Sequence, residues 1–182
     1  MSRSLEKITK SDLRKLLSLA KTDIDDFFSR KPEYRKYVGK EALIALCQGA
    51  ALHYIDGKTG VKDFDVWFFY PRLSKQLPYR RRGTVDFGPS KFGRFPKDAG
   101  LRGRRIDVLM RSEPSFSSKS PNSGLMQYLS EPKTATAKHL SRKAVVGLYP
   151  ESVFGKVLWP NKSLAAQAAG APKSLRGFGA SA

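Results

Sequence analysis

The chain has 182 residues, 40% of them hydrophobic and 11% aromatic, which is typical of one globular domain rather than two. Its 34 Lys and Arg residues exceed the 16 Asp and Glu residues and give a net charge of +18, which favours a polyanionic partner such as nucleic acid or an anionic membrane surface. A basic protein with no such partner stays open as the simpler interpretation. No apolar stretch approaches a membrane span of ~20 residues and none follows the first residues, so we expect a cytoplasmic protein with no membrane partner.

The first half of the chain predicts a helix, a short apolar segment and a strand. Apolar residues recur at helical spacing over residues 11–29, with Ser11 as the expected N-cap. Residues 42–48 form a short apolar run that is either a buried strand or part of a helix, and they include Cys47, which we expect to be a buried, inert thiol. Residues 50–54 have room for a turn or two of helix, and residues 61–70 give the clearest strand of the chain.

Residues 72–105 differ in composition from the rest and are interpreted as a basic loop insert with a short strand at 84–87. The segment contains 11 Lys or Arg residues against two acids, Asp86 and Asp98. Basic residues neutralise phosphates and interleaved aromatics stack on bases, so the insert predicts a nucleic-acid interface. Its expected basic residues are Arg80, Arg81, Arg82, Lys91, Arg94, Arg102, Arg104 and Arg105, and its expected stacking residues are Tyr79, Phe87, Phe92 and Phe95. The alternative is a solvated loop whose charge only maintains solubility.

The second half predicts short elements and a tail. A strand is expected at residues 106–110, a Ser/Pro linker at 112–123, short helices at 125–129 and 134–140, and a strand or helix at 144–149. Residues 153–159 add to the core. Residues 162–182 contain little to bury, so we predict a domain over 1–161 followed by a flexible tail.

Three aspartates are candidate metal ligands. Asp63 and Asp65 alternate with apolar residues, so in a strand their side chains lie on one face while Phe64 points to the core. Two like charges that close repel unless a cation lies between them, and carboxylates suit Mg²⁺ or Mn²⁺. Asp107 has a similar apolar frame and is the natural third ligand. The alternative is a pair of surface acids with Asp107 unrelated.

Together these residues resemble the nucleotidyltransferase superfamily of the polymerase-β type, particularly its small prokaryotic members. The family pattern is an apolar run, Gly followed by Gly or Ser, a gap, an acid–apolar–acid–apolar sequence, and a later acid on another strand. Here it reads Gly49-Ala50, then twelve residues, then Asp63 to Val66, and finally Asp107. The resemblance covers residues 42–110. Ala50 departs from it, because the usual Ser or Gly is missing.

The resemblance implies an α/β fold (α+β) in which a short mixed sheet, flanked by helices, holds the three carboxylates. It implies transfer of a nucleotidyl group from a nucleoside triphosphate to a hydroxyl, with Asp63 and Asp65 bridging two divalent ions and Asp107 holding one ion or accepting the proton. Gly49 and Ala50 would contact the triphosphate.

Three functions follow as hypotheses. The first is a metal-dependent nucleotidyltransferase acting on RNA, with tRNA as the natural acceptor. Small members of the family include toxins of toxin–antitoxin or phage-defence systems, so a cognate protein partner or antitoxin is an extension by analogy. The second is a non-catalytic nucleic-acid-binding protein with a degenerate nucleotidyltransferase fold. The third is a metal-dependent nuclease.

Overall fold

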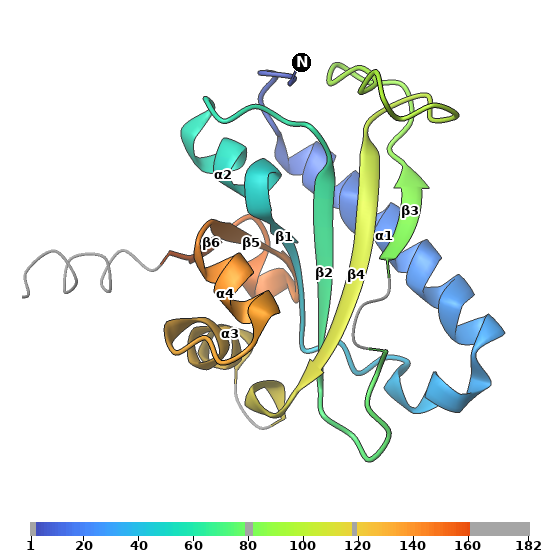
Figure 1. Ribbon diagram of the computed structural model, residues 1–182, viewed down its shortest axis with the longest axis vertical. Coiled ribbons are helices and arrows are strands. Elements are labelled where there is room, and N and C mark those ends of the chain that lie inside the picture. The colour runs from blue at the N-terminus through green and yellow to red at the C-terminus, as the bar shows by residue number, and fades with distance from the viewer. Residues whose placement is uncertain (1–2, 79–81, 118–119, 161–182) are drawn as a thin grey trace, which may run out of the picture.

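The computed structural model describes residues 3–78, 82–117 and 120–160, and it has one mixed sheet with helices on both faces (Figure 1). The six strands lie in the order β3-β4-β2-β1-β5-β6. Their bounds are β1 Leu43–Cys47, β2 Phe64–Pro71, β3 Arg82–Asp86, β4 Arg105–Glu113, β5 Ala144–Tyr149 and β6 Val157–Trp159. The α-helices are α1 Lys10–Arg30, α2 Gln48–Asp56, α3 Pro121–Ser130 and α4 Ala135–Ser141, and the short 3₁₀ helices are η1 Pro32–Tyr37, η2 Pro114–Phe116 and η3 Glu151–Val153. The predicted α/β class with a mixed sheet flanked by helices is confirmed.

The direction of the strands brings three element ends together. β2 and β4 are parallel neighbours, whereas β1 runs antiparallel to β2. The end of β1 therefore lies beside the start of β2 and of β4. Helix α2 follows β1 directly, so its N-terminus also lies at this end of the sheet, together with the first described residues of the chain and the loop after β3 (Figure 1).

The first helix is held by its periodic apolar face and a capping box. Its buried residues are Leu13, Leu16, Ala20, Ile24, Phe27 and Phe28. The hydroxyl of Thr9 accepts a hydrogen bond from the backbone N–H of Asp12, and the Asp12 carboxylate accepts one from the backbone N–H of Thr9. The prediction of Ser11 as N-cap was wrong, because the reciprocal pair begins two residues earlier.

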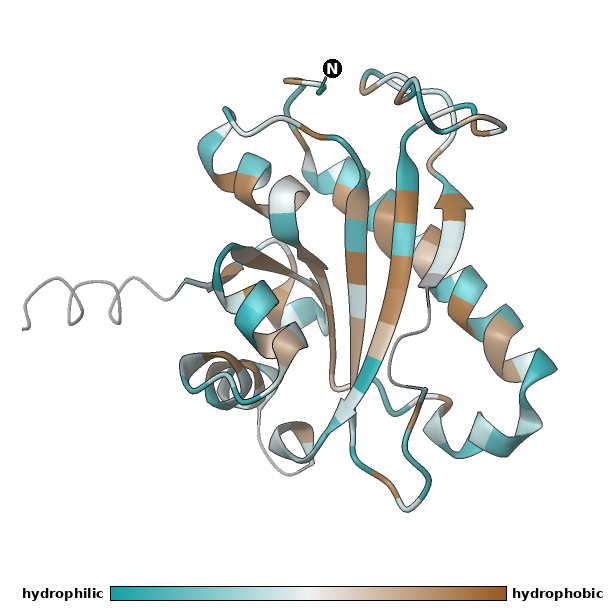
Figure 2. Ribbon diagram, in the orientation of Figure 1, coloured by the Kyte–Doolittle hydropathy of each residue, from teal (hydrophilic) through white to brown (hydrophobic). Residues whose placement is uncertain are grey.

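Each face of the sheet has its own hydrophobic core. Helices α1 and α2 cover the face that buries Phe64, Val66 and Phe68, and α3 and α4 cover the face that buries Trp67 and Phe69. The alternation along β2 therefore divides its side chains between two cores. Figure 2 shows hydrophobic residues along the middle of β2 and β4, and alternating bands of hydrophobic and hydrophilic residues along α1. Within residues 3–78, 82–117 and 120–160, no helix combines the length and the hydrophobicity that crossing a membrane requires.

Several predicted boundaries need correction. The run at residues 42–48 is strand β1 followed by the first residue of α2, and the segment at 144–149 is strand β5. The predicted linker at 112–123 was wrong. Ser112 and Glu113 continue β4 beside Tyr70 and Pro71 of β2, so the pairing partner extends the strand beyond its apolar centre. Residues 162–182 lie outside the described residues.

Candidate active site

Two of the three candidate acids are direct neighbours across parallel strands. Asp65 of β2 is in register with Asp107 of β4, and Cys47, the last residue of β1, is in register with Asp65. Asp63 lies one residue before β2 begins. Adjacent strands are about 4.8 Å apart, so the register places the carboxylates of Asp65 and Asp107 on the same face at close range.

A cavity of about 200 Å³ joins Asp63 and Asp65 to the beginning of α2. Its lining includes Gly49 and Ala50 from α2 and both Asp63 and Asp65. It also includes four basic residues, namely Arg3, Lys62, His139 and Lys143. Two regions that the sequence motif separates by twelve residues therefore share one cavity.

The basic residues of this cavity were missed in the sequence analysis. Arg3 precedes the first helix, and His139 and Lys143 lie at the end of α4 and in the turn before β5. No local pattern marks them, since they reach the cavity only through the packing of α4 and the N-terminal segment. Ser4 joins that segment to Val61 through a pair of backbone hydrogen bonds of 2.9 and 2.7 Å, which places Arg3 beside the loop before β2.

The first residue of α2 has a strained backbone. Gln48 has a φ of 67°, in a region that residues other than Gly adopt rarely and at a cost of roughly 1–3 kcal/mol. Its side chain is buried and lines the cavity, and within the described chain its Oε1 atom has no hydrogen-bond partner. A buried polar atom of this kind calls for a partner, which a bound ligand can supply.

The two candidate nucleotide-binding residues differ in surroundings. A Cβ atom added to Gly49 would meet nothing within 4 Å, so the backbone there faces open space. Ala50 lines the cavity and also packs in the core under α2. The backbone N–H groups in the first turn of a helix lack intrahelical partners, and together with the helix dipole they favour an anion.

Arg105 connects the acids to each other. Its Nη2 atom donates to Oδ2 of Asp63 at 2.8 Å, and its Nη1 atom donates to Oδ1 of Asp98 at 3.1 Å. Its Nε atom lies 3.2 Å from Oδ1 of Asp107. One guanidinium thus contacts two candidate metal ligands and an acid of the basic insert, and offsets part of their negative charge.

The acids fit a cation by their chemistry, since carboxylates are hard oxygen ligands and two of them already share the charge of Arg105. Within residues 3–78, 82–117 and 120–160, however, no three Asp, Glu, His or Cys side chains form a group able to hold a metal ion. A metal at Asp63, Asp65 and Asp107 therefore stays a prediction.

Two nearby residues have structural roles. Burial raises the pKa of the Cys47 thiol, and the charge of Asp65 raises it further, so Cys47 is an inert core thiol as predicted. His53 is buried, and its Nδ1 atom accepts a hydrogen bond from the backbone N–H of Gly60 at 3.1 Å. Its Nε2 atom lies 3.0 Å from the carbonyl oxygen of Glu6, so the ring joins the N-terminal segment to the loop before β2.

Several residues in the described part of the basic insert point inward rather than into solvent. The prediction that Phe87, Phe92 and Phe95 stack on bases was wrong, because all three rings are buried and two of them pack on Phe64. Arg104 is also buried, and it donates to the carbonyl oxygens of Phe92 and Lys62. These apolar rings and this guanidinium form the interior of the insert.

The remaining predicted nucleic-acid residues divide into three groups. Arg94 and Arg102 are exposed, and Arg102 also forms an ion pair with Asp86 at 3.7 Å. Lys91 forms an ion pair with Asp12 at 2.9 Å, which attaches the insert to α1. Tyr79, Arg80 and Arg81 lie outside the described residues, as does the side chain of Arg82.

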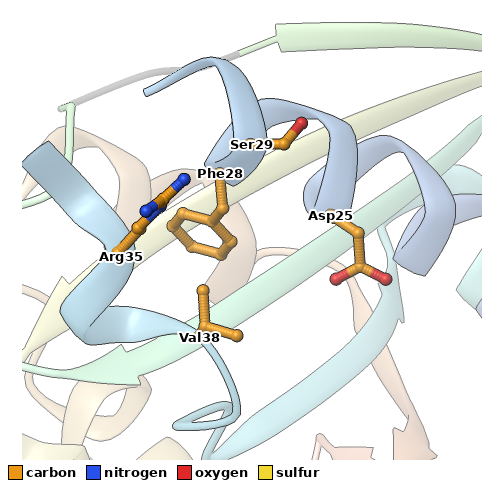
Figure 3. A pocket seen from close by; sticks show the side chains of 5 residues that line it. All are labelled: Asp25, Phe28, Ser29, Arg35 and Val38. Carbon is orange, nitrogen blue, oxygen red and sulfur yellow. The ribbon is translucent and has the colours of Figure 1, made fainter. Parts of the chain in front are cut away.

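A second hollow, of about 520 Å³, lies between α1 and η1. Its lining residues are Asp25, Phe28, Ser29, Arg35 and Val38, and Figure 3 shows the ring of Phe28 lying between Arg35 and Val38. It lacks the concentration of basic and acidic groups found beside α2, so we place the candidate chemistry at the acids.

Comparison of the chain with protein-family models, with curated proteins and with solved structures found no match.

Proposed function

We propose that the protein is a divalent-metal-dependent nucleotidyltransferase with RNA, tRNA included, as acceptor. In this reaction a hydroxyl oxygen of the acceptor bonds to the α-phosphorus of a nucleoside triphosphate. The bond from that phosphorus to the bridging oxygen of the β-phosphate breaks, and pyrophosphate leaves. The acceptor proton passes to a nearby base, and Asp107 is the candidate for that role.

The observation that supports the proposal best is the shared cavity of the α2 N-terminus and the acids. Gly49, Asp63 and Asp65 line one space, and Asp107 is the register partner of Asp65. This arrangement puts an anion-binding helix end next to carboxylates that attract a cation, which suits a metal-bound triphosphate. The resemblance to nucleotidyltransferases relies on the same residues.

The chain's own residues have separate roles in this proposal. The backbone N–H groups at the beginning of α2 bind phosphate oxygens. They do so on their own, because the side chain of Ala50 has no hydroxyl group to add a hydrogen bond. The side chains of Arg3, Lys62 and Lys143 neutralise the triphosphate. A divalent ion bound by Asp65, Asp107 and Asp63 would stabilise the attacking and leaving oxygens of the in-line displacement.

The acceptor assignment depends on charge. The net charge of +18 favours a polyanion, and Arg94 and Arg102 remain exposed on the insert. A toxin or defence role with a cognate protein partner or antitoxin extends the proposal by analogy to small family members.

A non-catalytic nucleic-acid-binding protein is the second candidate. Two observations favour it: Ala50 replaces the expected hydroxyl, and Arg105 contacts Asp63 and Asp107 directly. A site that had lost its metal would still need a positive charge beside its acids, and the guanidinium of Arg105 supplies one.

The decisive experiment incubates the protein with each α-labelled nucleoside triphosphate, Mg²⁺ or Mn²⁺, and total cellular RNA. Parallel reactions use γ-labelled triphosphate, whose label should leave in pyrophosphate. The variants are Asp65→Asn and Asp107→Asn, which are expected to reduce transfer by about 100-fold or more. The control is Asp26→Asn on the exposed face of α1, which removes the same charge away from the cavity.

Each outcome has a clear meaning. Label moving to RNA with the wild type and the control, but not with the site variants, supports the proposal and identifies the nucleotide. RNA that is bound without label favours the binding protein, and RNA that is shortened without label favours a nuclease.

A further inference from the structure

We propose that Arg105 is a built-in competitor of the metal, which holds the acids in the metal-free protein and must leave Asp63 and Asp107 before a divalent ion can bind. This inference relies on the metal site of the proposed function and adds its regulation. On this proposal the basic insert controls how tightly the metal binds, because Arg105 also contacts Asp98 of that insert.

The contacts of Arg105 give it the position of a metal substitute. All its three guanidinium nitrogens lie between 2.8 and 3.2 Å from carboxylate oxygens of three different aspartates. Two of these aspartates are predicted metal ligands, and they come from separate segments of the chain. A guanidinium and a divalent ion cannot both occupy the short distance to the same oxygens.

The charge around the site explains why a cation is needed. Asp107 is buried and Asp65 is its neighbour across the strands. Burying like charges side by side is costly unless a cation lies among them. Lys62 assists only at the edge, since its Nζ atom lies 3.5 Å from Asp63 and its side chain is 46% exposed.

Asp98 provides a position to which Arg105 can withdraw. Its carboxylate belongs to the insert, and its backbone N–H donates to the carbonyl oxygen of Phe95 at 3.0 Å. After Arg105 leaves Asp63 and Asp107, it still has the charge of Asp98 as a partner. The side chain of Arg105 is 22% exposed, so this movement does not require the core to open.

The first experiment measures Mn²⁺ binding by titration calorimetry at low salt, with no nucleotide or RNA present. Arg105→Gln removes the competitor and is expected to bind Mn²⁺ about tenfold more tightly than the wild type, equal to about 1.4 kcal/mol. Arg102→Gln is the matched control, because it removes the same charge from the insert but contacts none of these three acids. Its affinity is expected to match the wild type.

The second experiment measures melting temperatures with and without Mn²⁺. Without metal, Arg105→Gln is expected to melt below the wild type, because its acids repel each other. Saturating Mn²⁺ is expected to stabilise it more than the wild type and to close most of that gap. Arg105→Lys keeps the charge but has one nitrogen in place of the three that lie near separate carboxylates, so its Mn²⁺ affinity is expected to lie between the other two. This variant also tests the inference if Arg105→Gln does not fold.

The results separate the inference from the proposed function. If Mn²⁺ binds the wild type and both Arg105 variants equally, and Asp65→Asn weakens that binding, the metal site stands and the competition by Arg105 is refuted. If neither the wild type nor the Arg105 variants bind Mn²⁺, the proposed metal-dependent function itself fails. If Mn²⁺ binds an Arg105 variant more tightly and this binding requires Asp65, the inference is supported.

Discussion

Asp86 organises the turn that connects the basic insert to β4, and replacing it tests whether the insert is a folded unit. Its Oδ1 atom accepts hydrogen bonds from the backbone N–H groups of Gly88 and Gly103, both at 2.8 Å. Its Oδ2 atom accepts one from the backbone N–H of Arg102 at 2.9 Å. In Asp86→Asn an amide NH₂ group must replace one carboxylate oxygen, so at least one donor then faces another donor.

The expected cost follows from these bonds. A hydrogen bond to a charged group contributes about 1.5–3 kcal/mol, and the Asp86 side chain is 24% exposed, so we take about 2 kcal/mol for Asp86→Asn. For a chain of 182 residues this lowers the melting temperature by about 4–8 °C. The ion pair with Arg102 contributes little, because exposed pairs are typically worth about 0–1 kcal/mol.

The assay is urea unfolding of the wild type, Asp86→Asn and the control Arg102→Gln, at pH 7 and pH 3. Partial burial raises the pKa of Asp86, but the backbone donors of Arg102, Gly88 and Gly103 outweigh it and hold the pKa below its ordinary value. Folding therefore favours the charged form. This stabilisation is complete above the unfolded pKa of about 4 and is lost as the pH falls through the folded pKa, so the difference between wild type and Asp86→Asn should shrink at pH 3.

Two results would refute this reasoning. One is an Asp86→Asn variant as stable as the wild type at pH 7, which would show that the three backbone bonds add nothing. The other is an equal loss in Arg102→Gln, which would assign the effect to the ion pair.

Three further predictions concern the insert, the cavity and the loop after α2. In Gly103→Ala the new Cβ would lie 1.8 Å from the backbone oxygen of Gly88. We therefore expect the free energy of unfolding in urea to fall by about 3 kcal/mol or more. A fall below about 1 kcal/mol would contradict the packing of the insert. Lys143→Ala should weaken nucleoside triphosphate binding about fivefold in low-salt calorimetry. The control Lys138→Ala, on the exposed side of α4, should leave that affinity unchanged. If Lys143→Ala binds the triphosphate as tightly as the wild type does, Lys143 is not part of the site. The hydroxyl of Thr59, together with nearby backbone N–H groups, lowers the pKa of Asp56 to about 2. Asp56→Asn should therefore have a lower melting temperature than the wild type at pH 7, and nearly the same melting temperature near pH 2, where the wild-type carboxylate is losing its charge. A difference in melting temperature that persists at pH 2 would be the contrary result.

The sequence was informative wherever a residue's environment follows from its own element. The periodic apolar residues of α1 and the alternation along β2 were read directly, because side-chain direction has a fixed period within a helix or strand. The same alternation indicated that Asp65 would lie away from the core residues Phe64 and Val66. Their burial agrees with that reading, since both are fully buried.

The basic insert shows where composition fails. The sequence of the insert does not show which of its aromatic and arginine side chains are buried. In the structure Phe92 and Arg104 are buried, whereas Arg94 and Arg102 are exposed. Composition measures how much charge a segment holds, but the direction of each side chain depends on partners elsewhere in the chain. For Arg104 these partners are the carbonyl oxygens of Phe92 and Lys62.

The sequence by itself determined the fold class, the strand that contains Asp65 and the excess of positive charge. Only the tertiary structure decided that Asp65 faces Asp107 in register, that Arg3 and Lys143 line the same cavity as Asp65, and that Arg105 lies among the acids. The physical reason is that local periodicity fixes the face of a strand or helix on which a side chain lies. Which distant segments meet that face is fixed by strand order and core packing, and these involve the whole chain.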